Sequence, residues 1–101
     1  MDRTPAVYIV ASRRNGTPYT GVTPDLPGRV WQHRNKAFPG FSATHGCKRL
    51  VWFEVHGEME PAIVREKRVK HWNRAWRLAL IEKDNPTWRD LAEDWGFEPL
   101  S

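Results

Sequence analysis

Cysteine is nearly absent from this 101-residue chain, which contains only Cys47. A single cysteine excludes an internal disulfide framework and a zinc site built from several cysteines. No apolar run approaches the roughly 20 residues needed to span a bilayer, and the N-terminus has no hydrophobic segment typical of a signal peptide. These absences predict a cytoplasmic protein with no membrane partner.

Several common catalytic motifs are also missing. The sequence contains no nucleophile elbow, P-loop, dinucleotide-binding fingerprint or zinc-ligand spacing. The histidines His33, His45, His56 and His71 share no spacing, which disfavours a histidine metal site. Cys47 lies in a loop sequence with glycine and lysine, where an ordinary cysteine is favoured over a reactive thiol. We therefore expect no small-molecule cofactor.

Acidic residues are outnumbered, since 16 Lys and Arg stand against 12 Asp and Glu, giving a net charge of +4. This balance favours an anionic partner, with nucleic acid first, although a small protein that is merely basic fits it equally well. The apolar fraction of 40% and the six tryptophans indicate a packed globule. The length predicts one domain over residues 1–101, with a helical extension at about 74–96.

An Asn-Gly pair separates two runs rich in β-branched and aromatic residues, 7–10 and 18–23. Asn-Gly predicts a type I′ hairpin turn, because both central residues of that turn need a positive φ. We therefore expect an antiparallel hairpin with Asn15 and Gly16 at its tip.

That tip sets a register in which Val10 faces Gly21 and Tyr8 faces Thr23. Residues opposite one another share a face, and side chains alternate with a period of two. One face then carries two phenols and a bare glycine, from Tyr8, Tyr19 and Gly21. The other is an ordinary core face, formed by Val7, Ile9, Ala11, Thr20 and Val22.

Capping residues, prolines and periodicity predict the remaining elements. They are a helix over 26–36 capped by Asp25, a loop over 37–48, a central strand over 50–56, helices over 60–70 and 74–83, and a short helix over 88–95 capped by Asn85. Trp76, Leu80 and either Ala79 or Ile81 are expected to face the core, and the tail tryptophans to pack rather than stack on bases. The fold class predicted is mixed α/β (α+β), a three-stranded antiparallel sheet flanked by three to four helices.

Glu66 falls in the middle of the apolar seam of the helix over 60–70. A lone carboxylate there pays a desolvation penalty unless it is paired or binds a cation. The alternative is an edge glutamate paired with Lys70, four residues later and in the favourable orientation. By itself, the ion pair is the favoured interpretation.

Five polar side chains would converge if the helices over 26–36 and 60–70 both packed on the face with the phenols. They are Tyr8, Tyr19, Arg29, His33 and Glu66. Each has an ordinary explanation alone, as cross-strand packing, a solvated helix residue or an edge carboxylate. The ordinary explanations do not predict that all five would meet.

Four ordered motifs resemble those of the GIY-YIG endonuclease superfamily, and especially its small single-domain bacterial members. They are Ala6-Val7-Tyr8, Tyr19-Thr20-Gly21, Leu26-x-x-Arg29-x-x-x-His33 and Ala62-x-x-x-Glu66-x-x-x-Lys70, followed by Asn85-Pro86-x-Trp88-x-Asp90-Leu91. The resemblance covers nearly the whole chain. Ala6 and Thr20 replace the Gly and Ile of the superfamily motifs, and Val22 stands where repair nucleases carry a lysine.

The resemblance implies metal-dependent hydrolysis of a DNA phosphodiester bond. Glu66 would hold one divalent cation, Mg²⁺ or Mn²⁺, and Arg29 would bind the phosphate. Tyr8 or Tyr19 would activate the attacking water, with Tyr19 favoured by the resemblance. His33 would accept the proton, and Gly21 would let the backbone and the phosphate approach closely.

Basic side chains outside the site are expected to bind the DNA backbone electrostatically. They are Arg34, Lys36, Lys48, Arg49, Arg65, Arg68, Lys70 and the pair Arg74 and Arg77. We expect a monomer or weak dimer with weak sequence preference, acting on branched, flapped or single-stranded DNA. The alternatives are a non-catalytic nucleic-acid-binding module that retains the fold, and an interaction domain, which would require Trp88 and Trp95 to be exposed.

Overall fold

The most apolar run of the chain forms the central strand of a three-stranded antiparallel sheet. The computed structural model describes residues 5–14, 16–35 and 46–97. The strands are β1 (Ala6–Ala11), β2 (Pro18–Thr23) and β3 (Arg49–Val55), in the order β2-β1-β3. The prediction that β3 is central was wrong. β3 lies at an edge, but helices cover both faces of the sheet. Its side chains are therefore buried on both faces, as those of a central strand would be.

The β1–β2 hairpin differs from the predicted register by two residues. Val10 pairs with Tyr19, and Tyr8 pairs with Gly21. Because side chains alternate with a period of two, a shift of two residues leaves every side chain on its predicted face. Tyr8 and Tyr19 therefore lie on the same face of the sheet, as the sequence predicted.

The turn of this hairpin is longer than a two-residue type I′ turn. The Ser12 N–H donates to the Thr17 carbonyl at 3.1 Å, and the Gly16 N–H donates to the Arg13 carbonyl at 2.9 Å. Gly16 does not have a positive φ, and Asn15 lies outside the described residues. A Cβ on Gly16 would come within 2.4 Å of the Ser12 Oγ. This glycine is therefore required by a close approach and not by an unusual φ.

In the described ranges, three α-helices and one 3₁₀-helix follow the hairpin, and the sequence predicted these α-helices to within two residues. They are α1 (Leu26–Arg34), α3 (Met59–His71), α4 (Arg74–Asp84) and η1 (Leu91–Trp95). The predicted caps are present, because Asp25 accepts from the Gly28 N–H and Asn73 accepts from the Trp76 N–H. None of the helices in the described ranges is long and apolar enough to cross a membrane.

The short helix predicted over 88–95 is reduced to the 3₁₀ turn η1. Asn85 ends α4 instead of starting a new helix, and Trp88 has a φ of 58°. The Asn85 amide donates to the Val51 and Arg89 carbonyls at 3.1 and 2.8 Å. These hydrogen bonds fix a non-helical connection, and Asp90 caps η1.

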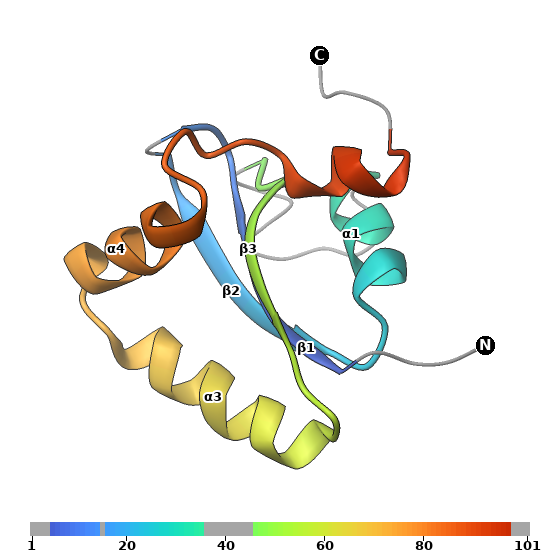
Figure 1. The fold of residues 1–101 in the computed structure, drawn as a ribbon, viewed down its shortest axis with the longest axis vertical. Coiled ribbons are helices and arrows are strands. Elements are labelled where there is room, and N and C mark those ends of the chain that lie inside the picture. Colours follow the sequence, from blue (N-terminus) through green and yellow to red (C-terminus); the bar gives the residue numbers. More distant parts are fainter. Residues whose placement is uncertain (1–4, 15, 36–45, 98–101) are drawn as a thin grey trace.

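Helices cover the sheet from both sides, with α1 on one face and α3 and α4 on the other (Figure 1). The core beneath α3 and α4 comprises Val7, Ile9, Ala11, Val51, Trp52, Ala62, Val69, Ile81 and Trp88. The core beneath α1 comprises Ala6, Tyr8, Val10, Leu26, Val30, Cys47, Leu50 and Ala92. Burial raises the pKa of the Cys47 thiol, which favours the ordinary cysteine that the sequence indicated.

The expectation that α1 and α3 share the face with the phenols was therefore wrong. The apolar seam of α3, represented by Ala62 and Val69, packs on the face of Val7 and Ile9. That face offers a continuous apolar surface, whereas α1 already occupies the opposite one.

The tryptophans divide between core and surface. Trp52 and Trp88 are buried, and the burial of Trp88 removes the condition for the interaction-domain alternative. Trp76, which was expected to face inward, is 60% exposed, and Ile81 takes the inward position on α4. Helical periodicity alone could not choose between these faces, because both carry apolar residues.

Candidate active site

The Tyr8 hydroxyl lies at the centre of a polar cluster between β1 and α1. Tyr8 is 1% exposed, and its hydroxyl oxygen lies 2.8 Å from Nε2 of His33. The rings of the two residues meet edge to face, with centroids 5.4 Å apart. The charge of Arg29, one helical turn before His33 on α1, also acts on this phenol. Arg29 and His33 therefore both act on Tyr8 from the same helix.

Burial sets the protonation states in this cluster. It raises the pKa of Tyr8 well above the usual range of a phenol, and Arg29 offsets only part of the rise. Burial, together with the Arg29 charge, lowers the pKa of His33 to about 4. At neutral pH the phenol is therefore protonated and the imidazole is neutral. A protonated phenol and a neutral imidazole fit a bond in which the Tyr8 O–H donates to the unprotonated Nε2 of His33.

Tyr19 lies beside this pair on β2. It is half-buried, and the centroid of its ring lies 5.5 Å from that of His33. The ammonium of Lys70 lies 5.8 Å from the centroid of the Tyr19 ring, within the range of a cation–π contact. Tyr19 therefore contacts His33 of α1 and Lys70 of α3.

Gly21 makes room for Tyr8. The two residues are paired across the hairpin, and a Cβ on Gly21 would lie 2.5 Å from the Tyr8 hydroxyl oxygen. The sequence predicted that this glycine would admit a phosphate to the backbone. The structure instead fills the space with the Tyr8 ring, so the glycine serves the packing of the site.

Glu66 approaches the cluster from α3, on the other side of the sheet. Its side chain is 11% exposed, and its Oε1 lies 3.4 Å from Nζ of Lys70. The charge of Glu66 contributes to the raised pKa of Tyr8, so the carboxylate acts on the phenol through space. Because α3 contacts the edge strand β2, Glu66 and Lys70 can act at this edge of the sheet. Both interpretations of Glu66 hold in part, since it is buried and it is paired.

A cavity of about 450 Å³ adjoins the cluster at Arg29. It is lined by Thr23, Pro24, Asp25, Gly28, Arg29, Trp31 and Gln32. Sequence reasoning did not select Trp31 as a functional residue. Its place in the sequence could have indicated it. Trp31 lies in α1 two residues after Arg29, and not on the helix side that carries the apolar residues Leu26 and Val30.

Arg34 and Arg49, two of the cations predicted to bind DNA, contact the segment that follows α4. Arg34 forms an ion pair with Asp90 at 2.5 Å, and the two side chains are only 10% and 3% exposed. The Nη1 of Arg49 donates to the Trp88 carbonyl at 3.1 Å. Neither guanidinium can turn to a phosphate without breaking these contacts, and the burial of Arg34 makes its loss costly.

The other predicted cations are spread over the surface. Arg65 pairs with Glu54 at 3.2 Å and lies over the Trp72 ring, whereas Arg68 is exposed on the same helix. Arg74 hydrogen-bonds to the Gly16 carbonyl at 3.4 Å. Lys48 and Arg77 are half-buried, and Lys36 lies outside the described residues.

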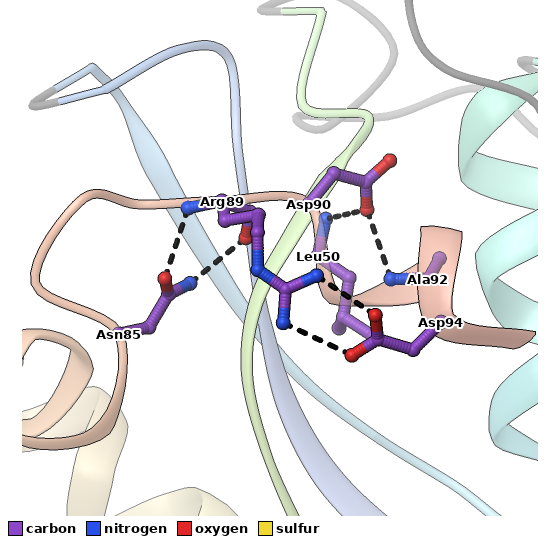
Figure 2. A network of polar contacts seen from close by, with 6 residues as sticks. All are labelled: Leu50, Asn85, Arg89, Asp90, Ala92 and Asp94. Atoms are coloured by element: carbon purple, nitrogen blue, oxygen red, sulfur yellow. Dashed lines mark hydrogen bonds and ion pairs between the residues drawn. The ribbon is translucent and has the colours of Figure 1, made fainter.

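The segment after α4 holds the C-terminal end of α1. Asp90 accepts from the backbone N–H groups of Leu50 at 3.2 Å and Ala92 at 3.1 Å (Figure 2), while its other oxygen pairs with Arg34. Nearby, Arg89 forms a bidentate pair with Asp94 at the surface. Asp90 therefore ties β3 and η1 to the helix that carries Arg29 and His33.

Comparisons with known proteins place these features in a family context. The model of the GIY-YIG catalytic domain matches residues 4–79. A UPF0213 protein of Staphylococcus epidermidis is 30% identical over 77 residues, which cover 76% of this chain and 93% of that protein. A UPF0213 protein of Aeromonas salmonicida is 27% identical over 90 residues, covering 89% of this chain and 65% of that protein. The solution NMR structure of a UPF0213 protein from Bacillus halodurans has a TM-score of 0.55 and 26% identity, covering 89% of this chain and 95% of that one.

Proposed function

Because this chain belongs to the GIY-YIG catalytic domain family, we propose that it is a metal-dependent endonuclease that hydrolyses DNA phosphodiester bonds. The observation that carries the proposal is the convergence on the Tyr8 hydroxyl. His33 from α1 hydrogen-bonds to this hydroxyl, the charges of Arg29 from α1 and Glu66 from α3 act on it, and the Tyr19 ring from β2 packs against His33. Perturbed titratable groups that converge in this way are typical of catalytic sites.

Glu66 fits a single hard divalent cation, Mg²⁺ or Mn²⁺. Its carboxylate is largely withdrawn from water and has the Lys70 ammonium at 3.4 Å. Within the described ranges, no group of three or more His, Cys, Asp or Glu could hold a metal. Water and substrate oxygens would have to complete the coordination, an arrangement that suits Mg²⁺. When bound, the cation would supply Lewis-acid stabilisation of the leaving oxygen.

Arg29 would bind the scissile phosphate. Its charge acts on the Tyr8 hydroxyl, and the residue also lines the cavity beside α1. A planar guanidinium can donate two parallel hydrogen bonds to a phosphate and can stabilise the extra charge of the transition state.

We assign different roles to the two phenols. Tyr8 is almost completely buried, so the attacking water is better reached from half-buried Tyr19, which would orient it. Tyr8 would position His33 through its hydrogen bond. The neutral imidazole of His33 would keep a proton acceptor in the cluster at physiological pH.

Cleavage assays with matched variants test this proposal. Labelled linear and branched DNA is incubated with Mg²⁺, Mn²⁺ or EDTA and with the wild type, Glu66→Gln, Arg29→Lys or Glu60→Gln. We expect Glu66→Gln and Arg29→Lys each to lose about 10²–10³ in rate while still binding DNA. Glu60→Gln, which removes an exposed carboxylate of the same helix, should cleave like the wild type.

Two results would contradict the proposal. Equal cleavage by all four proteins would place the activity outside this site. Binding without cleavage by the wild type in either cation would instead support a non-catalytic nucleic-acid-binding module.

A further inference from the structure

An exposed tryptophan lies next to the proposed phosphate-binding arginine. Trp31 is 54% exposed on α1 and lines the same cavity as Arg29. Among the described residues, its indole ring takes part in no ring or cation–π contact. A single exposed tryptophan is ordinary by itself. The position of this one, sharing a cavity with Arg29, is what requires an explanation.

The cavity between these residues fits a nucleobase better than a second phosphate. Its volume of about 450 Å³ is in the range typical of small-molecule sites. Besides the indole, it offers the Gln32 amide and the second oxygen of the Asp25 carboxylate, whose Oδ1 accepts from the Gly28 N–H; the Thr23 hydroxyl in its lining is engaged by the Asp25 backbone. The carboxylate would repel a phosphate, but amide and carboxylate oxygens can accept hydrogen bonds from the edge of a base. The Arg29 side of the cavity is therefore suited to an anion, and the Trp31 side to a base.

We propose that Trp31 is a stacking platform for an unpaired base adjacent to the phosphate held by Arg29. Within a duplex, each base is already stacked on its neighbours, so the indole face is available only to a base that has left the stack. The inference rests on the proposed nuclease function and narrows its substrate class. The preferred DNA would be unpaired at the cleaved site, as in single strands, flaps and bulges.

Binding measured in EDTA separates this proposal from the cleavage reaction. Fluorescence anisotropy is recorded with a labelled 20-nucleotide single strand and with a 20-base-pair duplex, using the wild type, Trp31→Ala, Trp31→Phe and Trp76→Ala. We expect Trp31→Ala to weaken single-strand binding about tenfold and duplex binding less than twofold. Trp31→Phe should retain most of the affinity. Trp76→Ala, which removes a comparably exposed tryptophan of α4, should bind both DNAs like the wild type.

A second strand tests whether the effect depends on a base. It carries abasic residues in place of all bases, so that the charge of the backbone is kept. The wild type should bind it about tenfold more weakly than the normal strand, and Trp31→Ala should bind both strands equally. This design compares affinities within each protein, so a general loss of folding cannot imitate the result.

The outcomes distinguish the two proposals. Equal losses on single strand and duplex, or no loss in Trp31→Ala, would overturn the stacking role even if the wild type cleaves DNA. A Trp31-dependent preference for normal over abasic strands, in a protein that cleaves nothing with Mg²⁺ or Mn²⁺, would uphold base stacking and overturn the nuclease proposal.

Discussion

The hydroxyl oxygen of Tyr8 lies 2.8 Å from Nε2 of His33, and this hydrogen bond joins the central strand to α1 across the buried face of the sheet. Replacing either residue with an apolar one would remove the hydrogen-bond partner that the other has in this contact. The contact therefore couples the packing of α1 to the protonation states of two groups in the candidate site. The first two predictions follow from this coupling.

Tyr8→Phe should destabilise the fold while preserving its shape. The substitution leaves the ring in place but removes the hydroxyl that hydrogen-bonds to Nε2 of the buried His33. An unsatisfied buried polar group costs about 1–3 kcal/mol, and we expect the free energy of unfolding in urea to fall by that amount. Tyr19→Phe, at a half-buried position, should cost less. Equal losses in the two variants would contradict the central role of the Tyr8 hydroxyl.

The protein should become less stable as the pH is lowered, because of His33. Its pKa is lowered to about 4 in the folded state, whereas an unfolded histidine titrates near 6.5. The unfolded chain therefore binds the extra proton between these values, so the contribution of His33 is complete above about pH 6.5 and is lost as the pH falls toward 4. The expected loss is of the order of 3 kcal/mol.

Urea denaturation at several pH values measures this effect. His33→Gln keeps a polar side chain but cannot titrate, so its stability should depend less on pH than that of the wild type across the same window. The pH profiles of the two proteins should converge at the acid end. Parallel profiles would show that other groups cause the pH dependence.

Gly21→Ala should disturb the site through a single methyl group. The new Cβ would lie 2.5 Å from the Tyr8 hydroxyl oxygen, so the Tyr8 ring must move and its contact with His33 must change. Overpacking of this kind costs about 1–3 kcal/mol. Thermal unfolding gives the loss, and an altered His33 pKa in an NMR titration would show the displacement. Gly57→Ala, where no atom lies within 4 Å of the new Cβ, should leave both quantities unchanged.

The sequence could predict that Tyr8 and Tyr19 lie on the same face of the sheet. This depends only on whether the register is shifted by an even or an odd number of residues. The hairpin register differs from the prediction by two residues, yet both phenols remain on one face. The helix caps Asp25 and Asn73 were equally predictable, since capping is a local interaction. Local rules of this kind account for most of the elements.

The arrangement of the helices around the site could not be predicted in the same way. The apolar side of α3 could pack against Val7 and Ile9 or on the opposite face beside α1. Tertiary packing decides between these faces, and no local sequence pattern reports it. The pairing of Arg34 with Asp90 joins residues far apart in the sequence, so no local pattern distinguishes Arg34 from a surface cation. Trp31 was missed for a related reason, because an exposed tryptophan gains meaning only from the cavity beside it.

Asp90→Asn should destabilise the protein strongly, because it removes the charge that compensates Arg34. Both side chains are nearly buried, and breaking a buried ion pair from one side costs about 3–5 kcal/mol. The amide retains one oxygen for the Leu50 and Ala92 N–H groups, so the loss reports mainly the broken ion pair with Arg34. Arg34→Met in the same chain should restore part of the stability, since it removes the buried guanidinium charge.

Asp94→Asn is the matched control for this last prediction. Asp94 pairs with Arg89 in the same segment, but both side chains are more than half exposed, and solvent screens such a pair. Its loss should therefore leave the urea midpoint nearly unchanged. If the two Asp→Asn variants unfolded at the same urea concentration, the buried pair would not be what holds α1. If Asp90→Asn alone were destabilised and Arg34→Met rescued it, then the segment beyond the matched GIY-YIG region would stabilise the helix that carries Arg29 and His33.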